Sequence, residues 1–190
     1  MFQKLLTYTT LILLATSCDQ PAALPADLTG YQTIAIPGSA SSKVLATNGD
    51  GAPTSSGYIL DGKKTATWTE YYPEGKIKSL TNYIDGKKNG SYLEFTNRGQ
   101  IELRSTYTND VLDGPSAKYK FGRPTEEMTY KNGELHGEMK TYFSNGKLQK
   151  LITFANGKQD GPLKYYDEEG NVTLEYMYKN GEKVSGGIVE

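Results

Sequence analysis

The sequence predicts an all-β protein, an elongated antiparallel β-meander of about five tandem 24-residue hairpin repeats. The first observation is an apolar slot, usually a ring, that returns every 23 or 24 residues, at Ile59, Tyr83, Tyr107, Tyr130, Phe154 and Tyr178. The second is a glycine seven residues after most of these slots, at Gly90, Gly114, Gly137 and Gly161. The third is period-two alternation of apolar and polar residues between turn signals, which indicates strands.

The composition favours a sheet whose apolar contacts come from rings. Only 36 % of the 190 residues are hydrophobic, yet 15 are tyrosine. The formal net charge of −1 gives no basic footprint for nucleic acid. One cysteine, Cys18, and one histidine, His136, exclude a disulfide framework and any multi-cysteine or multi-histidine metal site. We therefore expect no cofactor, no metal and no nucleic-acid partner.

The first 17 residues have the pattern of an export signal. Lys4 supplies the positive start, and an apolar run that is too short to span a bilayer ends at Ala15. Cys18 follows small residues directly, in a pattern that resembles the bacterial lipobox, although that motif usually has leucine where this chain has Ala15. The resemblance implies a lipidated Cys18 and a membrane-anchored lipoprotein of the bacterial cell envelope, whether periplasmic or at the surface. The alternative is an ordinary secretory signal followed by an incidental cysteine.

Residues 18–57 are expected to be a flexible tether between the anchor and the repeats. This segment holds half of the chain's 8 prolines and is rich in Ala, Ser, Gly and Thr. Within it, residues 31–36 alternate weakly and could add one strand to the array. The folded repeat domain is predicted to span residues 58–190.

Each repeat is predicted to be one hairpin with two kinds of turn. Asn-Gly and Asp-Gly pairs supply the positive φ angles that tight hairpins require; they occur at Asp61, Asp85, Asn132, Asn145, Asn156 and Asn180. The recurring glycine at the start of a strand, such as Gly90, permits a β-bulge. The third repeat is one residue short and has Pro124 where its neighbours have Ile, Leu or Val, so we expect a local bend there.

The unit from Tyr130 to Leu148 resembles a MORN repeat, in the bacterial variant that has a paired aromatic followed by a turn glycine. The pairs are Tyr71-Tyr72, Tyr142-Phe143 and Tyr165-Tyr166. The resemblance implies a single-layer twisted antiparallel sheet. It also implies a binding role, because MORN arrays are credited with lipid contact, protein scaffolding and dimerisation, and many bacterial variants are labelled antitoxin components.

No catalytic residue is predicted. His136 lies in a turn without a nucleophile motif beside it, and we interpret it as solvated. The acid pairs Glu126-Glu127 and Glu168-Glu169 are adjacent on their strands and so should point to opposite faces, unlike the carboxylates of a glycosidase. The acids from Asp110 to Asp113 are too sparse for a calcium loop.

The predicted function is therefore non-enzymatic binding of another protein or a surface polymer. One ring of each aromatic pair is expected to be exposed, because neighbours on a strand cannot both face inward; the candidate rings for the binding face are Tyr72, Phe143 and Tyr165. The alternative is an antitoxin or immunity protein that neutralises a toxin in the envelope. The two end strands of an open sheet could also pair edge to edge between chains.

Overall fold

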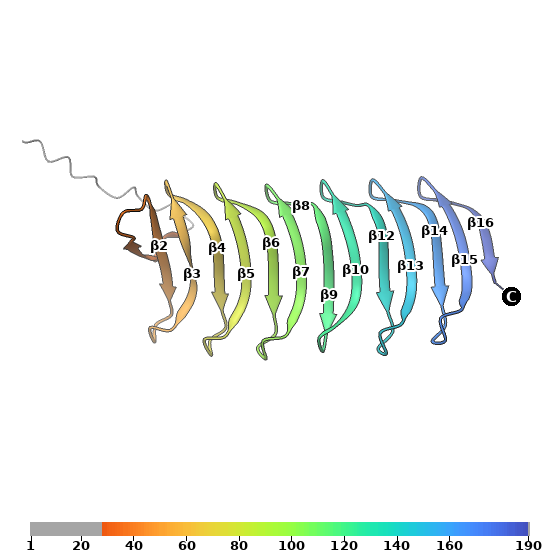
Figure 1. The fold of residues 1–190 in the computed structure, drawn as a ribbon, viewed down its shortest axis with the longest axis horizontal. Coiled ribbons are helices and arrows are strands. Elements are labelled where there is room, and N and C mark those ends of the chain that lie inside the picture. Colours follow the sequence, from red (N-terminus) through yellow and green to blue (C-terminus); the bar gives the residue numbers. More distant parts are fainter. Residues whose placement is uncertain (1–27, 190) are drawn as a thin grey trace, which may run out of the picture.

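The computed structural model describes residues 28–189, which form one open antiparallel sheet of sixteen strands (Figure 1). The predicted signal peptide and Cys18 lie outside this range. The strands are β1 (Gln32–Ala35), β2 (Ser41–Thr47), β3 (Pro53–Leu60), β4 (Lys63–Tyr71), β5 (Ile77–Ile84), β6 (Lys87–Phe95), β7 (Ile101–Thr108), β8 (Val111–Leu112), β9 (Gly114–Lys120), β10 (Arg123–Lys131), β11 (Glu134–Leu135), β12 (Gly137–Tyr142), β13 (Leu148–Ala155), β14 (Lys158–Tyr166), β15 (Val172–Lys179) and β16 (Glu182–Ile188).

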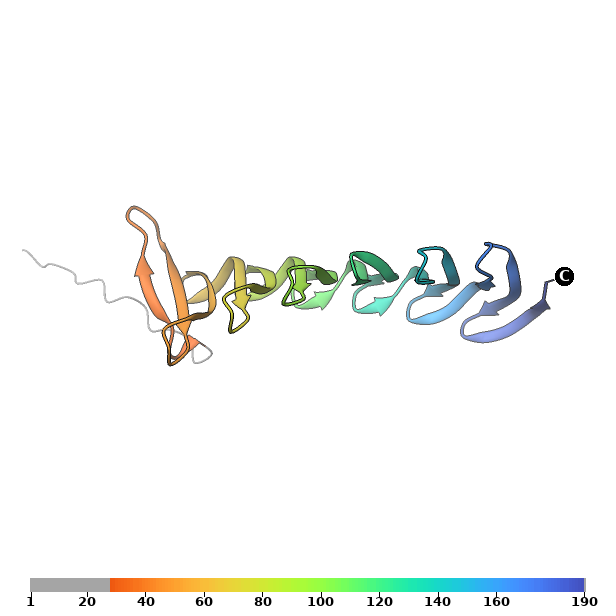
Figure 2. The same ribbon diagram turned by 90° about the horizontal axis from the view of Figure 1, so that it is seen from below.

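The chain runs through the sheet as a meander, which confirms the predicted fold class. Each strand pairs with the next along the chain, and the short β8 and β11 continue the lines of β9 and β12. Figure 2, seen at right angles to Figure 1, shows a long narrow array in which successive hairpins repeat along one axis. No helix or second sheet lies over the strands between residues 28 and 189.

At one end of the strands, at the top of Figure 1, two-residue turns join the strands of each hairpin. We call this row of turns the first edge. At Asp61, Asp85, Asn132, Asn156 and Asn180 φ is 51°, and the glycine that follows each also has positive φ. Two consecutive left-handed residues are the signature of the type I′ turn that matches the twist of a hairpin. The predicted Asn-Gly and Asp-Gly turns are confirmed here, with Asn145 as the exception.

At the other end of the strands, at the bottom of Figure 1, the turns are mostly longer. We call this row of turns the second edge, or second-turn edge, and Asn145 lies in one of its turns. In five turns the residue after the strand accepts a hydrogen bond from the glycine three positions later, as Tyr72 O does from Gly75 N at 2.8 Å and Phe143 O from Gly146 N at 2.9 Å. This is a four-residue turn that ends on a left-handed glycine, and Asn145 keeps negative φ. The prediction of a tight Asn145-Gly146 hairpin is therefore wrong, because the dipeptide signal does not reveal which kind of turn the longer loop needs.

The glycines at the strand starts form the predicted bulges. Gly90, Gly114, Gly137 and Gly161 have φ between 84° and 125°. The register shifts opposite two of them, between Thr81 and Tyr83 and between Ile152 and Phe154. At Pro124 a register shift also occurs, but equivalent shifts occur at Tyr71, Tyr142 and Tyr166. Pro124 therefore occupies an irregularity that neighbouring units share.

The boundary predicted at residue 58 differs from the structure. β1, β2 and most of β3 lie within residues 32–57, which were expected to be a tether. Leu28 and Val44 are fully buried and pack with Ile59 and Trp68 in the one core cluster found among residues 28–189. The reason is that Pro53 is the first residue of a strand, where its missing N–H costs nothing, so proline content was a poor guide here. The suggested strand over residues 31–36 is confirmed as β1, which pairs with β2.

The strand register assigns the side chains to two faces. Directly opposed residues share a face, and so do alternate residues of one strand. Trp68 opposes Thr81 and Tyr83 lies two residues further, so the ring slots share a face with Trp68, which we call the ring face. The opposite face, which we call the charged face, carries one cross-strand row of mixed sign: Arg104, Glu127, Lys140, Lys164 and Glu175, with Ala117 and Leu151 among them.

Candidate binding site at the second-turn edge

The structure separates the three predicted binding rings. Tyr72 and Phe143 take the same position, the first residue of a long turn at the second edge. Tyr165 instead lies within β14, directly opposite Lys150 and Leu174 on the ring face. The three rings therefore do not form one surface. The cause is that Tyr165 precedes the ring at the end of its strand, whereas Tyr72 and Phe143 follow theirs.

Tyr72 is held in place by the next repeat. Its hydroxyl donates to the carbonyl oxygen of Phe95 at 2.7 Å, and the side chain is half-buried. The neighbouring turn is closed by Thr96, whose hydroxyl accepts from the backbone N–H of Arg98 at 3.2 Å and of Gln100 at 3.1 Å. These bonds keep the two turns at a fixed spacing along the edge.

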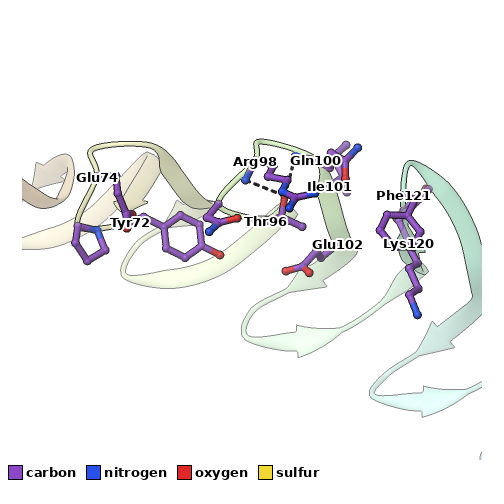
Figure 3. Close-up of a pocket in the computed structure, with 12 residues that line it drawn as sticks. Tyr72, Glu74, Thr96, Arg98, Gln100, Ile101, Glu102, Lys120 and Phe121 are labelled. Atoms are coloured by element: carbon purple, nitrogen blue, oxygen red, sulfur yellow. Dashed lines mark hydrogen bonds between the residues drawn. The ribbon is translucent and has the colours of Figure 1, made fainter.

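A hollow of about 630 Å³ opens between these turns and the third repeat, and we call it hollow 1. Figure 3 shows Tyr72 and Glu74 at one side, Arg98 and Gln100 on the middle turn, and Phe121 with Lys120 at the far side. Its lining is completed by Pro73, Thr96, Asn97, Ile101, Glu102 and Tyr119. Two carboxylates and two cations lie around apolar walls, and no ion pair joins them.

A second hollow of about 440 Å³, hollow 2, lies on the other side of Phe121. It is lined by Lys120, Phe121, Arg123, Pro124, Thr125, Tyr142, Phe143 and Ser144. Arg123 donates from Nη1 to the carbonyl oxygen of Ser144 at 3.3 Å, which links the two walls. Both ionised side chains in this lining are cationic, so hollow 2 has a positive and aromatic character.

Phe121 stands between the two hollows and lines both. Its side chain is 76 % exposed, and its φ is 52°. The third repeat is one residue short in the sequence, but a functional role for Phe121 was not predicted from it. The available signal was its alignment with Asn97 of the preceding unit, where a polar residue is replaced by a large apolar one.

Tyr142, in the wall of hollow 2, is hydrogen-bonded to a carboxylate on the neighbouring strand β10. Its hydroxyl donates to Glu127 Oε2 at 2.5 Å. Burial, followed by the hydrogen bond and the negative charge of Glu127, raises the pKa of Tyr142 to about 12. Glu126, the adjacent acid, faces the other way and pairs with Lys118 at 3.3 Å. The acid pair is thus split between the two faces, as the strand alternation predicted.

His136 differs from the prediction of a solvated turn residue. It occupies the break between β11 and β12, is half-buried, and has a buried Nδ1 without a hydrogen-bond partner. The equivalent bulge positions hold Asp113 and Asp160, whose carboxylates accept from the backbone N–H of the next hairpin turn. Over residues 28–189 there is no group of three or more His, Cys, Asp or Glu side chains placed to hold a metal ion. The same range contains no helix with the length and apolarity needed to cross a bilayer.

The fold and this edge define a tandem-hairpin repeat protein with an open sheet and a row of turns available for contact. A family model of the MORN repeat variant matches residues 64–85, 135–156 and 159–180. The chain therefore carries MORN-variant repeats, which confirms the resemblance seen in the sequence. Repeats of this kind suggest a repeat-based binding module.

Two solved structures that resemble the chain are larger proteins, and each is matched over part of its length. The chain resembles a crystal structure of TarM with a TM-score of 0.36 and 11 % identity over 57 % of this chain and 21 % of that one. A structure of a mutant of S. aureus TarM in complex with fondaparinux, α-GlcNAc-glycerol and UDP gives a TM-score of 0.30 and 8 % identity over 84 % of this chain. The chain spans about a fifth of the length of these proteins. A search of curated proteins gave no significant match.

Proposed function

We propose that the protein is a non-enzymatic lipoprotein of the bacterial cell envelope that binds another protein, or a surface polymer, along its second-turn edge. The observation that carries the proposal is the pair of hollows lined by Tyr72, Phe121 and Phe143. Aromatic and arginine side chains around a concave surface are the composition of binding hot spots. The hydrogen bonds at Tyr72 and Arg123 hold this surface in shape before a partner arrives, which lowers the entropic cost of binding.

The edge is tested by a double substitution, Tyr72→Ala with Phe143→Ala, in affinity capture from detergent-solubilised native envelopes. We expect the parent to retain a specific partner and the double variant to lose it. Tyr165→Ala is the matched control, because it removes an exposed ring on the ring face of β14 that lines neither hollow. Retention of folding is checked by circular dichroism. Equal capture by the parent and the folded double variant would remove the second-turn edge as the binding surface.

The anchor is tested separately at Cys18. A lipidated cysteine holds a protein at a membrane through its buried acyl methylenes. Cys18→Ser should abolish incorporation of labelled palmitate and move the protein from the membrane fraction to the soluble fraction. A parent protein that takes up no label and remains soluble would leave only the binding part of the proposal.

The alternative function is that of an antitoxin or immunity protein, which would use the same edge to cover a toxin that acts in the envelope. Co-expression with the product of a neighbouring gene distinguishes the two: rescue of growth by the parent, and not by the Tyr72 and Phe143 double variant, favours the antitoxin.

Self-association is proposed through the open end of the sheet. Within residues 28–189, β16 is the last strand of the sheet, and Val184 and Ile188 on it are 62 % and 82 % exposed. Unpaired backbone groups and apolar side chains on an end strand favour pairing with another chain. Sedimentation velocity should show a dimer that Val184→Lys disrupts, and a strictly monomeric parent would exclude this pairing.

A further inference from the structure

Phe121 combines two unfavourable features at one position. A large side chain in the left-handed region costs about 1 kcal/mol or more relative to glycine or asparagine, and φ of Phe121 is 52°. Its ring is also 76 % exposed to water. The other tight turns with this geometry begin with Asp or Asn: Asp61, Asp85, Asn109, Asn132, Asn156 and Asn180. The fold alone does not require a phenyl ring at this turn.

The surroundings of Phe121 are positively charged. Lys120 Nζ lies 5.7 Å from the centre of its ring, and Arg123 follows two residues later. No ion pair is found for either cation within residues 28–189. Hollow 2 contains both cations and no carboxylate, whereas hollow 1 balances Arg98 and Lys120 with Glu74 and Glu102. The edge is therefore cationic on the side of Phe121 that faces Phe143.

We propose that Phe121 is a protruding anchor that enters an apolar pocket on an acidic protein partner, with the partner's carboxylates facing Lys120 and Arg123 across hollow 2. This inference rests on the proposed function and names the chemistry of the partner. Buried aromatic anchors at the centre of an interface contribute a large share of its affinity, and complementary charges at the rim set orientation and association rate.

The geometry favours a folded protein over a bilayer or a glycan. The turns on both sides of Phe121 are longer than its own and carry polar residues, including Arg98 and Ser144, so a flat bilayer would meet these residues as well. A linear glycan has no closed apolar pocket in which to bury a phenyl ring. A folded protein can supply both a pocket for the ring and raised regions that fill the two hollows.

The experiment places the photo-cross-linker p-benzoylphenylalanine at position 121 of the full chain in its native cells. The matched control carries the same amino acid at position 156, the first residue of a tight turn on the opposite edge. We expect one protein adduct at position 121 and none at position 156. Mass spectrometry of the linked peptide should locate it in an apolar pocket rimmed by Asp or Glu.

Charge reversal then tests the acidic rim. In the cross-linking background, Lys120→Glu or Arg123→Glu should lower the adduct yield on the order of tenfold, because like charges would face each other. Glu134→Gln removes an exposed carboxylate beside the first-edge turn at Asn132 that lines neither hollow, and it should leave the yield unchanged. A protein adduct that is insensitive to both reversals would overturn the assignment of an acidic partner.

Phe121→Asn separates binding from folding. Asparagine tolerates the left-handed turn, so the urea midpoint should stay equal or rise, while affinity for the cross-linked protein should fall on the order of 30-fold. A lower urea midpoint with unchanged affinity would show that Phe121 has a structural role and would overturn the proposal. Adducts with lipid, with glycan or with a second copy of this chain would also overturn it, as would Phe121-dependent binding to vesicles of phosphatidylcholine and phosphatidylglycerol.

The outcomes for the proposed function and for this inference are distinct. If the Tyr72 and Phe143 double variant loses capture but position 121 gives no adduct, the edge binds a partner and Phe121 is not its anchor. If capture is unaffected and no adduct forms, both are refuted.

Discussion

We expect a single methyl group added at Gly57 to disturb the packing of the core around Trp68 strongly. Gly57 lies in β3 beside the indole of Trp68, which is 5 % exposed. A Cβ at residue 57 would lie 2.3 Å from the indole, more than 1 Å closer than the 3.4 Å at which ordinary contact begins. The indole cannot simply move away, because Tyr31 and Tyr83 flank it with ring centres at 5.8 and 6.1 Å. Its Nε1 also donates to the carbonyl oxygen of Tyr58 at 3.0 Å.

Gly57→Ala is therefore expected to lower the free energy of unfolding by about 1–3 kcal/mol, the usual cost of overpacking a core. Trp68 is the chain's single tryptophan, so its emission reports this region alone. We expect a red-shifted maximum in the folded variant and a lower urea midpoint by fluorescence. Because repeat arrays unfold in part from their ends, the midpoint by circular dichroism should fall less.

The controls for this substitution are Gly49→Ala and Gly187→Ala. A Cβ at either glycine would meet nothing within 4 Å, and neither has positive φ. Both should leave the emission and the urea midpoint unchanged. If Gly57→Ala behaves as these controls do, the packing of Trp68 against the β3 backbone is not what holds this end of the sheet together.

Three further predictions concern the repeats. Tyr142, whose pKa is raised to about 12 by burial and then by Glu127, stays protonated in the folded protein above pH 10 while the unfolded chain ionises. The free energy of unfolding should therefore fall between pH 10 and 12, and Glu127→Gln should bring the tyrosinate absorbance transition to lower pH. Gly161→Ala should cost roughly 1–3 kcal/mol in urea unfolding, because φ is 125° and the new Cβ would lie 3.0 Å from a threonine side chain. His136→Asp should add about 1 kcal/mol to the free energy of unfolding, because an aspartate there can accept the turn N–H as Asp160 does at 3.3 Å.

Each of these has an internal comparison. Glu126→Gln removes a carboxylate from the opposite face and should not move the transition of Tyr142; an equal shift would mean that general charge, not the bond to Glu127, sets it. Gly137→Ala shares positive φ but meets nothing within 4 Å, so it should cost less than Gly161→Ala; an equal cost would reject the steric contact. His136→Asn tests the third: if it stabilises as much as His136→Asp, the charge of the acceptor is irrelevant.

Turns, strands and bulges could be predicted from the sequence because each depends on the conformational preferences of a few neighbouring residues. Asn-Gly and Asp-Gly pairs favour left-handed turns, and in five of the six predicted pairs the Asn or Asp has φ of 51°. The period of the rings then located the strands, and the glycines after them located the bulges. The one turn that was misassigned, at Asn145, shows the limit of this signal, since the same dipeptide also fits a longer loop.

The start of the domain was not readable in the same way. Residues 32–57 resemble a linker in composition, and their place in the sheet depends on contacts with residues much further along the chain. Val44 is buried because Ile59 and Trp68 close over it, and neither lies in the segment itself. Composition averaged over a window contains no information about such contacts.

The sequence by itself determined the repeat, the strands and most of the turns, since each depends on the intrinsic conformational preferences of neighbouring residues. Only the tertiary structure decided which surface those repeats offer. It moved Tyr165 away from Tyr72 and Phe143, because cross-strand register selects the face, and it exposed Phe121 between two hollows, because one missing residue shortens a turn relative to its neighbours in space. Register and turn alignment are relations between strands, and a linear pattern specifies them only after the strands have been paired.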